Sequence, residues 1–293
     1  MKNNILIIGN GFVGSKLRKH LFDKQNDNVY QLSNLNYFDP RFVQNDIENC
    51  MVTKNIDWII NCVGYTGSPN VDGCESNKED TWALNVTFPT ILATIATKYS
   101  AKLINISSGC IYTGYEKSYT EDCEPNFGLW TPGSSWYSKT KHACELSFQN
   151  FTNVFNFRIR MPITGDLIEK KNYLTKILKY DNLIDYKNSK TVIEDLLLFT
   201  HEFINRYNTL TPVSGNYNVV NPDPLTTKDI VDILKRFGYS NPNWKWIDLE
   251  TLYKSTKCGR SNCVLDNYKT TRATGIELPS ERESVINLLE NGK

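Results

Sequence analysis

A tyrosine and a lysine that could exchange a proton with a substrate lie four residues apart, at Tyr137 and Lys141. This spacing puts both side chains on one face of a helix, which Ser134 or Ser135 can cap and which we expect to run to about Phe148. A tyrosine hydroxyl ordinarily titrates near pH ~10, so it transfers protons poorly at neutral pH unless a nearby cation stabilises the phenolate. Lys141 would supply that cation.

Ser107 and Ser108 end a predicted buried strand, where hydroxyl groups would face the cleft of an open parallel sheet. Ser108 and Tyr137 could then both hydrogen-bond the oxygen of a ketone, while Tyr137 delivers a proton as hydride reaches the carbon. A Tyr-x-x-x-Lys spacing alone is equally compatible with a solvated helix face. Ser108, Tyr137 and Lys141 therefore indicate hydride transfer only if the chain also has a site for a hydride-carrying cofactor.

Gly9, Gly11 and Gly14 form a G-x-G-x-x-G turn between a continuous apolar run, Ile5–Ile8, and a helical stretch. The first glycine allows a tight turn, the second lets the backbone approach a pyrophosphate, and the third permits close helix–strand packing. The helix N-terminus then offers free N–H groups and a positive dipole end to phosphates. Three ordinary turn glycines are the alternative, but the strand–turn–helix context favours a dinucleotide cofactor.

The end of the predicted second strand reads Gln31-Leu32-Ser33-Asn34. An NAD-specific site usually has an acidic residue here to hold the ribose hydroxyls, and this stretch has none. Ser33 and Asn34 could tolerate a 2′-phosphate, although no arginine is adjacent to them. We therefore expect NADPH as the cofactor, with NADH as the alternative.

Apolar strands alternate with helical stretches along the first half of the chain, with strand-like runs at 5–8, 29–32, 57–63 and 102–107 and a helix over 80–99. This alternation predicts an α/β fold with a doubly wound parallel sheet of the Rossmann type. Further strands are expected at 155–161 and 215–220. The remaining segments are richer in Asn, Lys, Pro and Trp. We therefore predict a dinucleotide-binding domain at 1–161 and 191–221, and a smaller, discontinuous substrate-binding lobe at 162–190 and 222–293.

The charge of the 293-residue chain is nearly balanced, with 33 basic and 32 acidic residues and a net charge of +1. This balance provides no electrostatic footprint for nucleic acid. No apolar run approaches membrane-spanning length, the first residues lack a signal-peptide pattern, and eight scattered cysteines lack a zinc-site spacing. We expect a cytoplasmic protein that holds no metal and binds neither nucleic acid nor membrane.

Together these motifs resemble the extended short-chain dehydrogenase/reductases. Segments 70–75 and 260–266 are similar to substrate-side segments of the dTDP-4-dehydrorhamnose reductases. The closest resemblance is to the bifunctional 3,5-epimerase/4-reductases that make UDP-L-rhamnose, through segments 108–111, 137–141, 158–163 and 172–177. Those enzymes usually carry a GxxGxxG turn, which is one residue longer than the turn at Gly9–Gly14. Their preference for one cofactor therefore applies less directly to this chain. The resemblance implies that the cofactor contacts Gly9, Asn10, Gly11, Phe12, Val13, Gly14, Cys62, Val63, Gly64, Tyr137 and Lys141.

In that family a cysteine and a lysine form the acid/base pair of the epimerisation, and the matching residues here are Cys110 and Lys176. A 4-keto group acidifies the hydrogens on C3 and C5, so a base and an acid on opposite faces can invert each centre through an enolate. The hydroxyls that hold the ketone for reduction would also stabilise that enolate. Without the resemblance, a small buried thiol and a solvated helix lysine would be the simpler interpretations.

Arg260 is the expected partner of a substrate diphosphate, because a guanidinium pairs bidentately with phosphate oxygens. A surface ion pair is the alternative interpretation of this residue. The resemblance also implies substrate contacts for three asparagines, Asn85, Asn172 and Asn262.

The resemblance implies an NADPH-dependent oxidoreductase that also acts as an isomerase and converts UDP-4-keto-6-deoxyglucose to UDP-L-rhamnose. Such an enzyme would act downstream of a 4,6-dehydratase, and a homodimer is the expected assembly. A monofunctional 4-dehydrorhamnose reductase working after a separate epimerase, or a non-catalytic nucleotide-binding protein on the same fold, are the alternatives. A 4,6-dehydratase fits less well, because Gly109 and Cys110 stand where those enzymes usually carry an acidic pair. The choice between UDP and dTDP stays open.

Overall fold

Six parallel strands form the central sheet of this computed structural model, which describes residues 2–32 and 39–291, without the side chains of 40–42. The strands lie side by side in the order β2-β1-β3-β4-β6-β8, and every neighbouring pair is parallel. Their bounds are β1 Asn4–Ile8, β2 Asn28–Leu32, β3 Trp58–Asn61, β4 Lys102–Ser108, β6 Val154–Ile159 and β8 Gly215–Asn218. The predicted parallel α/β sheet is confirmed.

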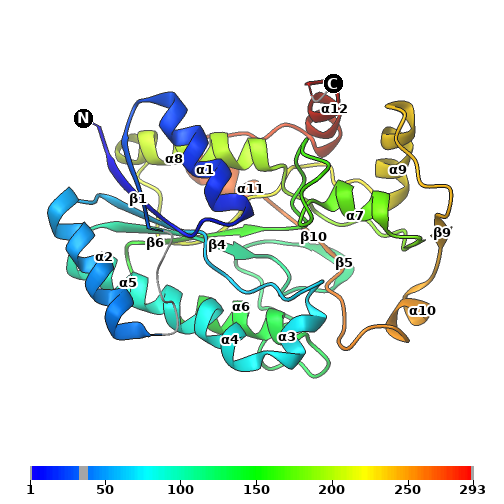
Figure 1. Cartoon of the computed structure of the whole chain (residues 1–293), viewed down its shortest axis with the longest axis horizontal. Helices are drawn as coiled ribbons and strands as arrows, with labels where there is room; N and C mark the ends of the chain where they lie inside the picture. Colours follow the sequence, from blue (N-terminus) through cyan, green and yellow to red (C-terminus); the bar gives the residue numbers. More distant parts are fainter. Residues whose placement is uncertain (1, 33–38, 292–293) are drawn as a thin grey trace.

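Helices cover both faces of this sheet, as the continuous apolar strands require. Ile5 and Ile7 pack on one face with α1 and α8, whereas Leu6 and Ile8 pack on the other face with α2, α5 and α6. Figure 1 shows the two helical layers above and below the sheet. The bounds are α1 Phe12–Lys24 and α8 Ile193–Leu210 on the first face, and α2 Pro40–Lys54, α5 Phe88–Lys98 and α6 Trp136–Ser147 on the second.

The helix expected over residues 80–99 is interrupted. It consists of α4 (Lys78–Trp82), one π-helical turn η1 (Ala83–Thr87) and α5. A π-helical turn inserts a residue into the helical ladder and often marks a functional site. Asn85 lies in this turn, and its side chain is fully buried. Hydrophobic spacing alone does not predict such a turn, because the apolar face remains continuous on both sides of it.

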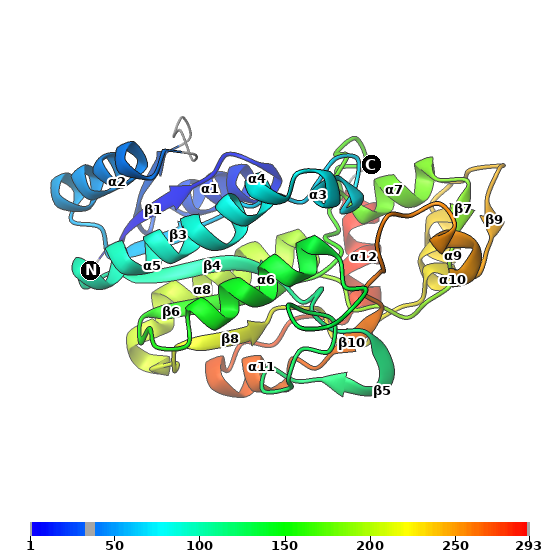
Figure 2. The ribbon, with the colours of Figure 1, turned by 90° about the horizontal axis from the view of Figure 1, so that it is seen from below.

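A third apolar cluster lies apart from the two sheet faces and is built only from residues 163–192 and 225–289. Figure 2 shows its helices gathered on the right of the view. It corresponds to the predicted substrate lobe, although Ala273, Ile276 and Leu278 pack against the first sheet face instead. The predicted domain boundaries therefore remain a prediction. Elements of this region are α7 Tyr173–Lys179, β7 Asn182–Leu183, α9 Thr227–Arg236, β9 Lys245–Trp246, α10 Leu249–Tyr253, α11 Tyr268–Thr274 and α12 Glu281–Asn291.

Two short elements connect the lobe to the sheet domain. Strand β5 (Gly114–Tyr119) follows the central strand β4 in sequence, and it pairs in parallel with β10 (Cys263–Leu265) from the C-terminal part of the chain. A buried ion pair of 2.8 Å between Lys190 and Glu281 joins two further segments of the lobe. The C-terminal third is thereby held against the end of β4, where candidate catalytic residues lie.

Four asparagines form a ladder across the sheet. Asn61, Asn105, Asn156 and Asn216 occupy paired positions on β3, β4, β6 and β8. The first three amide nitrogens each donate to the next amide oxygen, at 2.7 Å from Asn61 to Asn105, 2.7 Å from Asn105 to Asn156 and 3.0 Å from Asn156 to Asn216. The oxygen of Asn61 accepts from the Val63 backbone N–H. Buried amides of this kind require such partners, so the ladder fixes strand register beneath the site.

Among the residues that the structure describes, no helix is both long and apolar enough to cross a membrane. Within the same residues, no group of three or more histidine, cysteine or acidic side chains is arranged to hold a metal ion. All eight cysteines are free thiols.

Candidate active site

The turn after β1 has the geometry that close approach of a phosphate requires. Gly9 has a φ of +103°, and a Cβ there would lie 3.0 Å from the carbonyl carbon of Cys62. A Cβ on Gly14 would lie 2.3 Å from the Gly9 carbonyl oxygen, so α1 packs as closely as a glycine permits. Among the described residues, nothing lies within 4 Å of the corresponding point on Gly11. The middle glycine therefore leaves open space in front of the helix N-terminus.

This open space fits a pyrophosphate. Gly11 is the N-cap of α1 and provides no side-chain hydrogen bond to the first turn of the helix. The free N–H groups and the positive end of the helix dipole thus remain available to an anion. Asn10 is exposed beside the turn, Phe12 is buried, and Val13 is half-buried in the first sheet-face cluster. The residues present fit a dinucleotide, and the individual cofactor contacts stay predictions.

The end of β2 carries an amide where an NAD-specific site usually has a carboxylate. Gln31 donates from Nε2 to the Gly9 carbonyl oxygen at 3.2 Å and so supports the glycine turn. Ser33 and Asn34, which the sequence singles out for a 2′-phosphate, lie outside the described residues. The described part of this segment therefore presents no acidic group to a ribose.

Ser108, Tyr137 and Lys141 come together at the carboxyl end of the sheet, and all three are buried. The Ser108 side chain adjoins the Tyr137 hydroxyl, and the Lys141 ammonium lies 5.7 Å from the centre of the tyrosine ring. Burial raises the pKa of Tyr137 and lowers the pKa of Lys141. Ser135 rather than Ser134 caps their helix, accepting from the Ser138 N–H at 3.0 Å.

Asn85 positions the loop after β3 rather than presenting its amide to a ligand. Its oxygen accepts from the Tyr65 N–H at 2.8 Å, and its nitrogen donates to the Tyr65 carbonyl at 2.9 Å and to Thr140 Oγ1 at 3.1 Å. A Cβ on Gly64 would lie 3.3 Å from the Asn85 oxygen and 3.4 Å from the Lys141 nitrogen. We therefore assign Asn85 to positioning, and its substrate contact is untested. In the same loop, burial raises the pKa of the Cys62 thiol to about 12.

Cys110 and Lys176 lie close enough to interact electrostatically, although they come from different segments. Cys110 follows β4, and its backbone N–H donates to Ser108 Oγ at 3.2 Å. Lys176 lies on α7, which Asn172 caps by accepting from the Leu174 N–H at 3.1 Å. Burial, with help from Lys171, lowers the pKa of Lys176. Cys110 also lies close enough to Tyr137 to interact with it electrostatically, and the acid/base role of Cys110 and Lys176 stays a prediction.

Asn172 has no polar atom left for a ligand in this arrangement. Its amide nitrogen donates to the carbonyls of Thr164 and Asp166, each at 2.8 Å, and its oxygen also accepts from the Thr164 N–H at 3.2 Å. The side chain is fully buried. Asn172 therefore orients α7, which carries Lys176. Its contact with substrate stays a prediction.

The expected diphosphate partner Arg260 is engaged within the protein. It forms a bidentate ion pair with Asp72 of α3 (Asp72–Ser76), at 3.0 and 2.7 Å. Burial opposes ionisation of this carboxyl, but hydrogen bonds from Arg260 and Cys258 outweigh it and hold the pKa of Asp72 below its ordinary value. Nearby, the Asn262 oxygen accepts from Asn188 Nδ2 at 3.0 Å. The structure thus brings the two predicted substrate-side segments together, and their contacts with substrate stay predictions.

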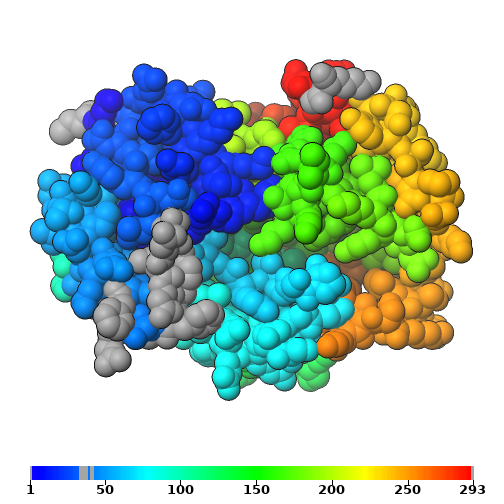
Figure 3. Space-filling view, viewed as in Figure 1, coloured from blue at the N-terminus to red at the C-terminus, as the bar shows by residue number. Residues whose placement is uncertain are grey.

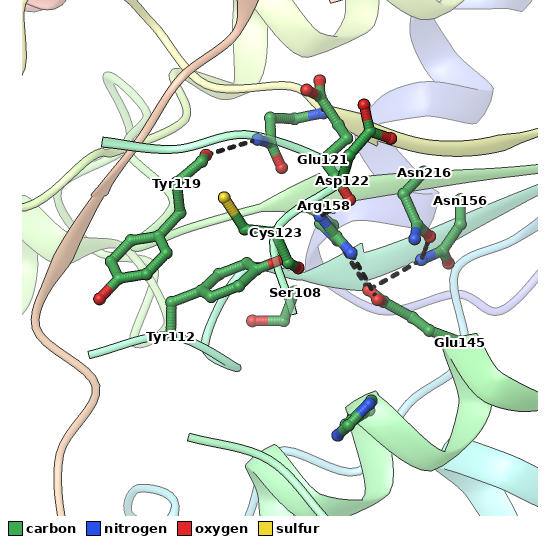
Figure 4. A network of polar contacts seen from close by, with 12 residues as sticks. Ser108, Tyr112, Tyr119, Glu121, Asp122, Cys123, Glu145, Asn156, Arg158 and Asn216 are labelled. Carbon is green, nitrogen blue, oxygen red and sulfur yellow. Dashed lines mark hydrogen bonds and ion pairs between the residues drawn. The ribbon is translucent and has the colours of Figure 1, made fainter. Parts of the chain in front are cut away.

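Sequence reasoning missed the acidic and basic residues that hold the catalytic helix. Arg158 forms a buried bidentate pair with Glu145 of α6, at 2.9 and 2.6 Å, and Asn156 donates to the same carboxylate at 3.1 Å (Figure 4). Burial opposes the charge on Arg158, but Glu145 raises its pKa. At the other end of α6, Glu75 accepts from the Trp136 N–H at 2.6 Å. The sequence does contain one indication of the Arg158–Glu145 pair, because Arg158 is a charged residue within an apolar strand and such a residue needs a buried partner.

The surface is hollowed between the sheet domain and the lobe. In Figure 3 a recess separates the cyan surface around α3 and α4 from the green surface around α7. The sheet domain and the lobe thus face each other across the edge where the strands end, which is where open α/β sheets bind their ligands.

Fold and site together define a Rossmann-type α/β protein, with its candidate hydroxyl and lysine groups at the carboxyl ends of the strands. The chain belongs to the family described as "RmlD substrate binding domain", which matches residues 3–293. It is therefore a member of that family over almost its whole length.

Two curated relatives come from Arabidopsis thaliana. A bifunctional dTDP-4-dehydrorhamnose 3,5-epimerase/dTDP-4-dehydrorhamnose reductase is 33% identical over 97% of this chain and 91% of its own length. A trifunctional UDP-glucose 4,6-dehydratase/UDP-4-keto-6-deoxy-D-glucose 3,5-epimerase/UDP-4-keto-L-rhamnose-reductase is 32% identical over 94% of this chain. The match spans only 40% of that longer protein.

Solved structures share the fold. The crystal structure of the L780 UDP-rhamnose synthase from Acanthamoeba polyphaga mimivirus has a TM-score of 0.86 at 24% identity, covering 99% of both chains. The dTDP-4-dehydrorhamnose reductase from Bacillus anthracis, in complex with NADP, has a TM-score of 0.80 at 18% identity and also covers 99% of both chains. At these identities the likeness concerns the fold.

Proposed function

We propose that this protein reduces the 4-keto group of a nucleotide-linked 6-deoxy sugar with NADPH and first inverts C3 and C5 of that sugar. The proposed conversion is UDP-4-keto-6-deoxyglucose to UDP-L-rhamnose. The observation that carries the proposal is the buried set of Ser108, Tyr137 and Lys141 beside the open glycine turn. The bifunctional and trifunctional relatives support it.

In the reduction, Ser108 and Tyr137 bind the ketone oxygen, and Tyr137 donates its proton to that oxygen as the alcohol forms. Bound NADPH supplies the hydride to the carbonyl carbon. The Lys141 ammonium stabilises the phenolate that Tyr137 leaves behind, since a nearby cation favours the charged form of a phenol. Burial of all three groups excludes water and strengthens these interactions.

In the epimerisation, a base removes the proton from C3 or C5, and the electron pair passes to the C4 oxygen, which Ser108 and Tyr137 stabilise as an enolate. An acid on the opposite face then returns a proton to the same carbon with inverted configuration. Cys110 and Lys176 are the proposed pair. The lowered pKa of Lys176 suits such a role, because its amine exchanges protons nearer to neutral pH than an ordinary lysine does.

The substrate needs a positive group for its diphosphate, and Arg260 supplies it in this proposal, by exchanging or sharing its pairing with Asp72. The names of the curated relatives are divided between dTDP and UDP sugars, and UDP is the nucleotide of this proposal. A 4-keto-6-deoxy sugar is the product of a 4,6-dehydration, so a 4,6-dehydratase must act upstream. We further propose a homodimer as the working assembly.

The test is to incubate the protein with UDP-4-keto-6-deoxyglucose in deuterated water, with and without NADPH, and to follow the sugar by NMR. Deuterium entering C3 and C5 without NADPH, then a rhamnose product once NADPH is added, would support both activities. Cys110→Ala should abolish exchange, whereas Cys50→Ala, which removes a thiol from α2 on the outer side of the sheet, should not.

Two other outcomes lead to the alternative functions. Reduction without exchange at either carbon would indicate a monofunctional 4-ketoreductase that relies on a separate epimerase. Binding of NADPH or UDP without any turnover of a ketosugar would indicate a non-catalytic nucleotide-binding protein on the same fold.

A further inference from the structure

Arg160 is a buried arginine without an acidic partner. Only 2% of its surface is exposed, and it takes part in none of the ion pairs found among the described residues. The two arginines discussed above differ in this respect, since Arg158 pairs with Glu145 and Arg260 pairs with Asp72. An isolated buried charge is strongly unfavourable, so its retention calls for an explanation.

The four shorter hydrogen bonds of the Arg160 guanidinium go to neutral oxygen atoms. Nη1 donates to the Gly109 carbonyl at 3.0 Å and to Ser261 Oγ at 2.7 Å. Nη2 donates to Asn188 Oδ1 at 3.0 Å and to the Ser261 carbonyl at 3.1 Å. Nε is buried and has no partner. These bonds orient the guanidinium but leave its charge uncompensated.

Cys110 is the ionisable group to which this guanidinium is directed. Its Sγ lies 3.9 Å from Arg160 Nη1, which is within hydrogen-bond reach for sulfur. Gly109 makes this approach possible, because a Cβ there would lie 3.2 Å from Arg160 Cγ and Cδ and 2.4 Å from Leu265 Cδ1. The loop after β4 therefore closes directly over the arginine side chain.

Other titratable groups interact with Cys110 or with Arg160: Tyr137 and Lys141 of α6, Lys176 of α7, Cys263 of β10 and Tyr115 of β5, and of these Tyr137 and Cys263 interact with both. Burial lowers the pKa of both lysines, so each is a weaker source of permanent positive charge here. A guanidinium, in contrast, stays protonated in proteins. Arg160 is therefore the constant cation next to the sulfur.

We propose that Arg160 is a positioning residue that stabilises the thiolate of Cys110 and so makes this thiol the base of the epimerisation. The inference rests on the proposed function. The thiolate takes the proton from C3 or C5 and becomes a thiol, and the C–H electron pair forms the enolate. The Lys176 ammonium then gives its proton to the same carbon from the other face. Solvent returns the thiol and the amine to their starting states, so protons and charge balance.

The first measurement needs no variant. The wild-type protein is alkylated with iodoacetamide across a pH series, and the rate at Cys110 is read by mass spectrometry of its peptide. We expect the half-maximal rate about one pH unit or more below that of glutathione in the same tube, since a free thiol titrates near pH ~8.5 and only the thiolate reacts. A midpoint equal to that of glutathione would overturn the inference.

The second measurement compares variants. Arg160→Gln removes the charge and should raise the Cys110 midpoint by about one pH unit, which is about tenfold less thiolate at neutral pH. Arg160→Lys should recover most of the shift. Arg282→Gln is the matched control, because it removes an exposed arginine of α12 whose partner is Asp229, and it should leave the midpoint unchanged. Circular dichroism shows whether each variant is folded.

A purely structural role for Arg160 would give a different pattern. Arg160→Gln and Arg160→Lys would then impair deuterium exchange equally. The midpoint of Cys110 alkylation would not depend on the charge at position 160. The inference and the proposed function fail separately. An Arg160-dependent midpoint in a protein that exchanges no deuterium would retain the charge coupling and reject epimerisation, whereas exchange with an unshifted midpoint would reject only the role of Arg160.

Discussion

Arg260 and Asp72 are 188 residues apart in sequence and form a bidentate ion pair, with Nη1–Oδ1 at 3.0 Å and Nη2–Oδ2 at 2.7 Å. The pair joins α3 of the sheet domain to the segment before β10. A guanidinium in this state is already oriented and neutralised. A substrate diphosphate must therefore compete with the Asp72 carboxylate for it or approach the remaining edge of the group.

We expect Asp72→Asn to tighten UDP binding and Arg260→Lys to weaken it by about tenfold or more, because lysine loses the bidentate geometry. Isothermal titration with UDP measures both effects. Lys254→Gln is a suitable control, since Lys254 pairs only with exposed Glu250 on the nearby helix α10. Unchanged affinity in Arg260→Lys would place the diphosphate elsewhere.

Two glycines of the first turn should respond differently to alanine. Gly11→Ala meets none of the described residues within 4 Å and should fold normally, but its methyl group enters the space of the proposed pyrophosphate and should weaken NADPH binding. Gly14→Ala would place its Cβ 2.3 Å from the Gly9 carbonyl oxygen and should destabilise the protein itself. Fluorescence titration with NADPH and thermal unfolding distinguish the two effects, and equal behaviour of the two variants would contradict this account of the turn.

Removing the Tyr137 hydroxyl should abolish proton donation while leaving the fold intact. We expect Tyr137→Phe to lower kcat for ketone reduction by on the order of 10²- to 10⁴-fold, the range for loss of a general acid. NADPH affinity should change little. Tyr99→Phe removes a hydroxyl that bonds Glu48 on the outer helices, and its turnover should match that of the wild type. Full activity in Tyr137→Phe would rule out its assigned role.

We expect the lowered pKa of Lys141 to set the alkaline limit of the proposed reduction. The reaction needs the ammonium form, so activity is present below the pKa of Lys141 and is lost as the pH rises through it. Burial lowers this pKa from 10.5, and the loss should therefore occur below pH 10.5. Lys141→Arg should move the alkaline loss to higher pH, if it retains turnover. Measuring kcat against pH checks the prediction, and an alkaline limb at or above 10.5 in the wild type would disagree with it.

The buried Arg158–Glu145 pair should dominate the stability of the catalytic helix. Glu145→Ala removes the carboxylate that pairs with the buried Arg158 and leaves it the Glu121 carbonyl as an acceptor, and we expect a loss of about 3–5 kcal/mol in the free energy of unfolding. Urea denaturation measures this loss. Glu48→Ala, which breaks the exposed pair with Lys98, should have a much smaller effect. Similar losses in both variants would mean that burial does not decide the strength of the pair.

Short sequence patterns were enough to predict the structural features that depend only on neighbouring residues. The apolar run of β1 predicts a strand covered on both faces, and the spacing of Tyr137 and Lys141 predicts their common helix face. The three glycines predict the turn because only that residue type tolerates the backbone approach found there. Each of these predictions depends on neighbours within a few residues in sequence.

Other features depend on partners that are distant in sequence. The π-helical turn at Asn85 follows from packing against Tyr65 and Thr140, and a helical hydrophobic pattern carries no trace of it. Arg260 and Asn172 could be expected near a ligand by type, yet their bonds to Asp72 and to the Thr164 backbone exist only once the lobe is assembled.

The sequence by itself determined the parallel α/β class, the glycine turn and the Ser108, Tyr137 and Lys141 set, because strand burial and helix periodicity are written into short segments. Only the tertiary structure decided which charges are compensated. Arg158, Arg160 and Arg260 are the same residue type in the sequence, but two have carboxylate partners and the third faces Cys110. The energy of a charge depends on distances to groups that folding brings together, and no local pattern contains those distances.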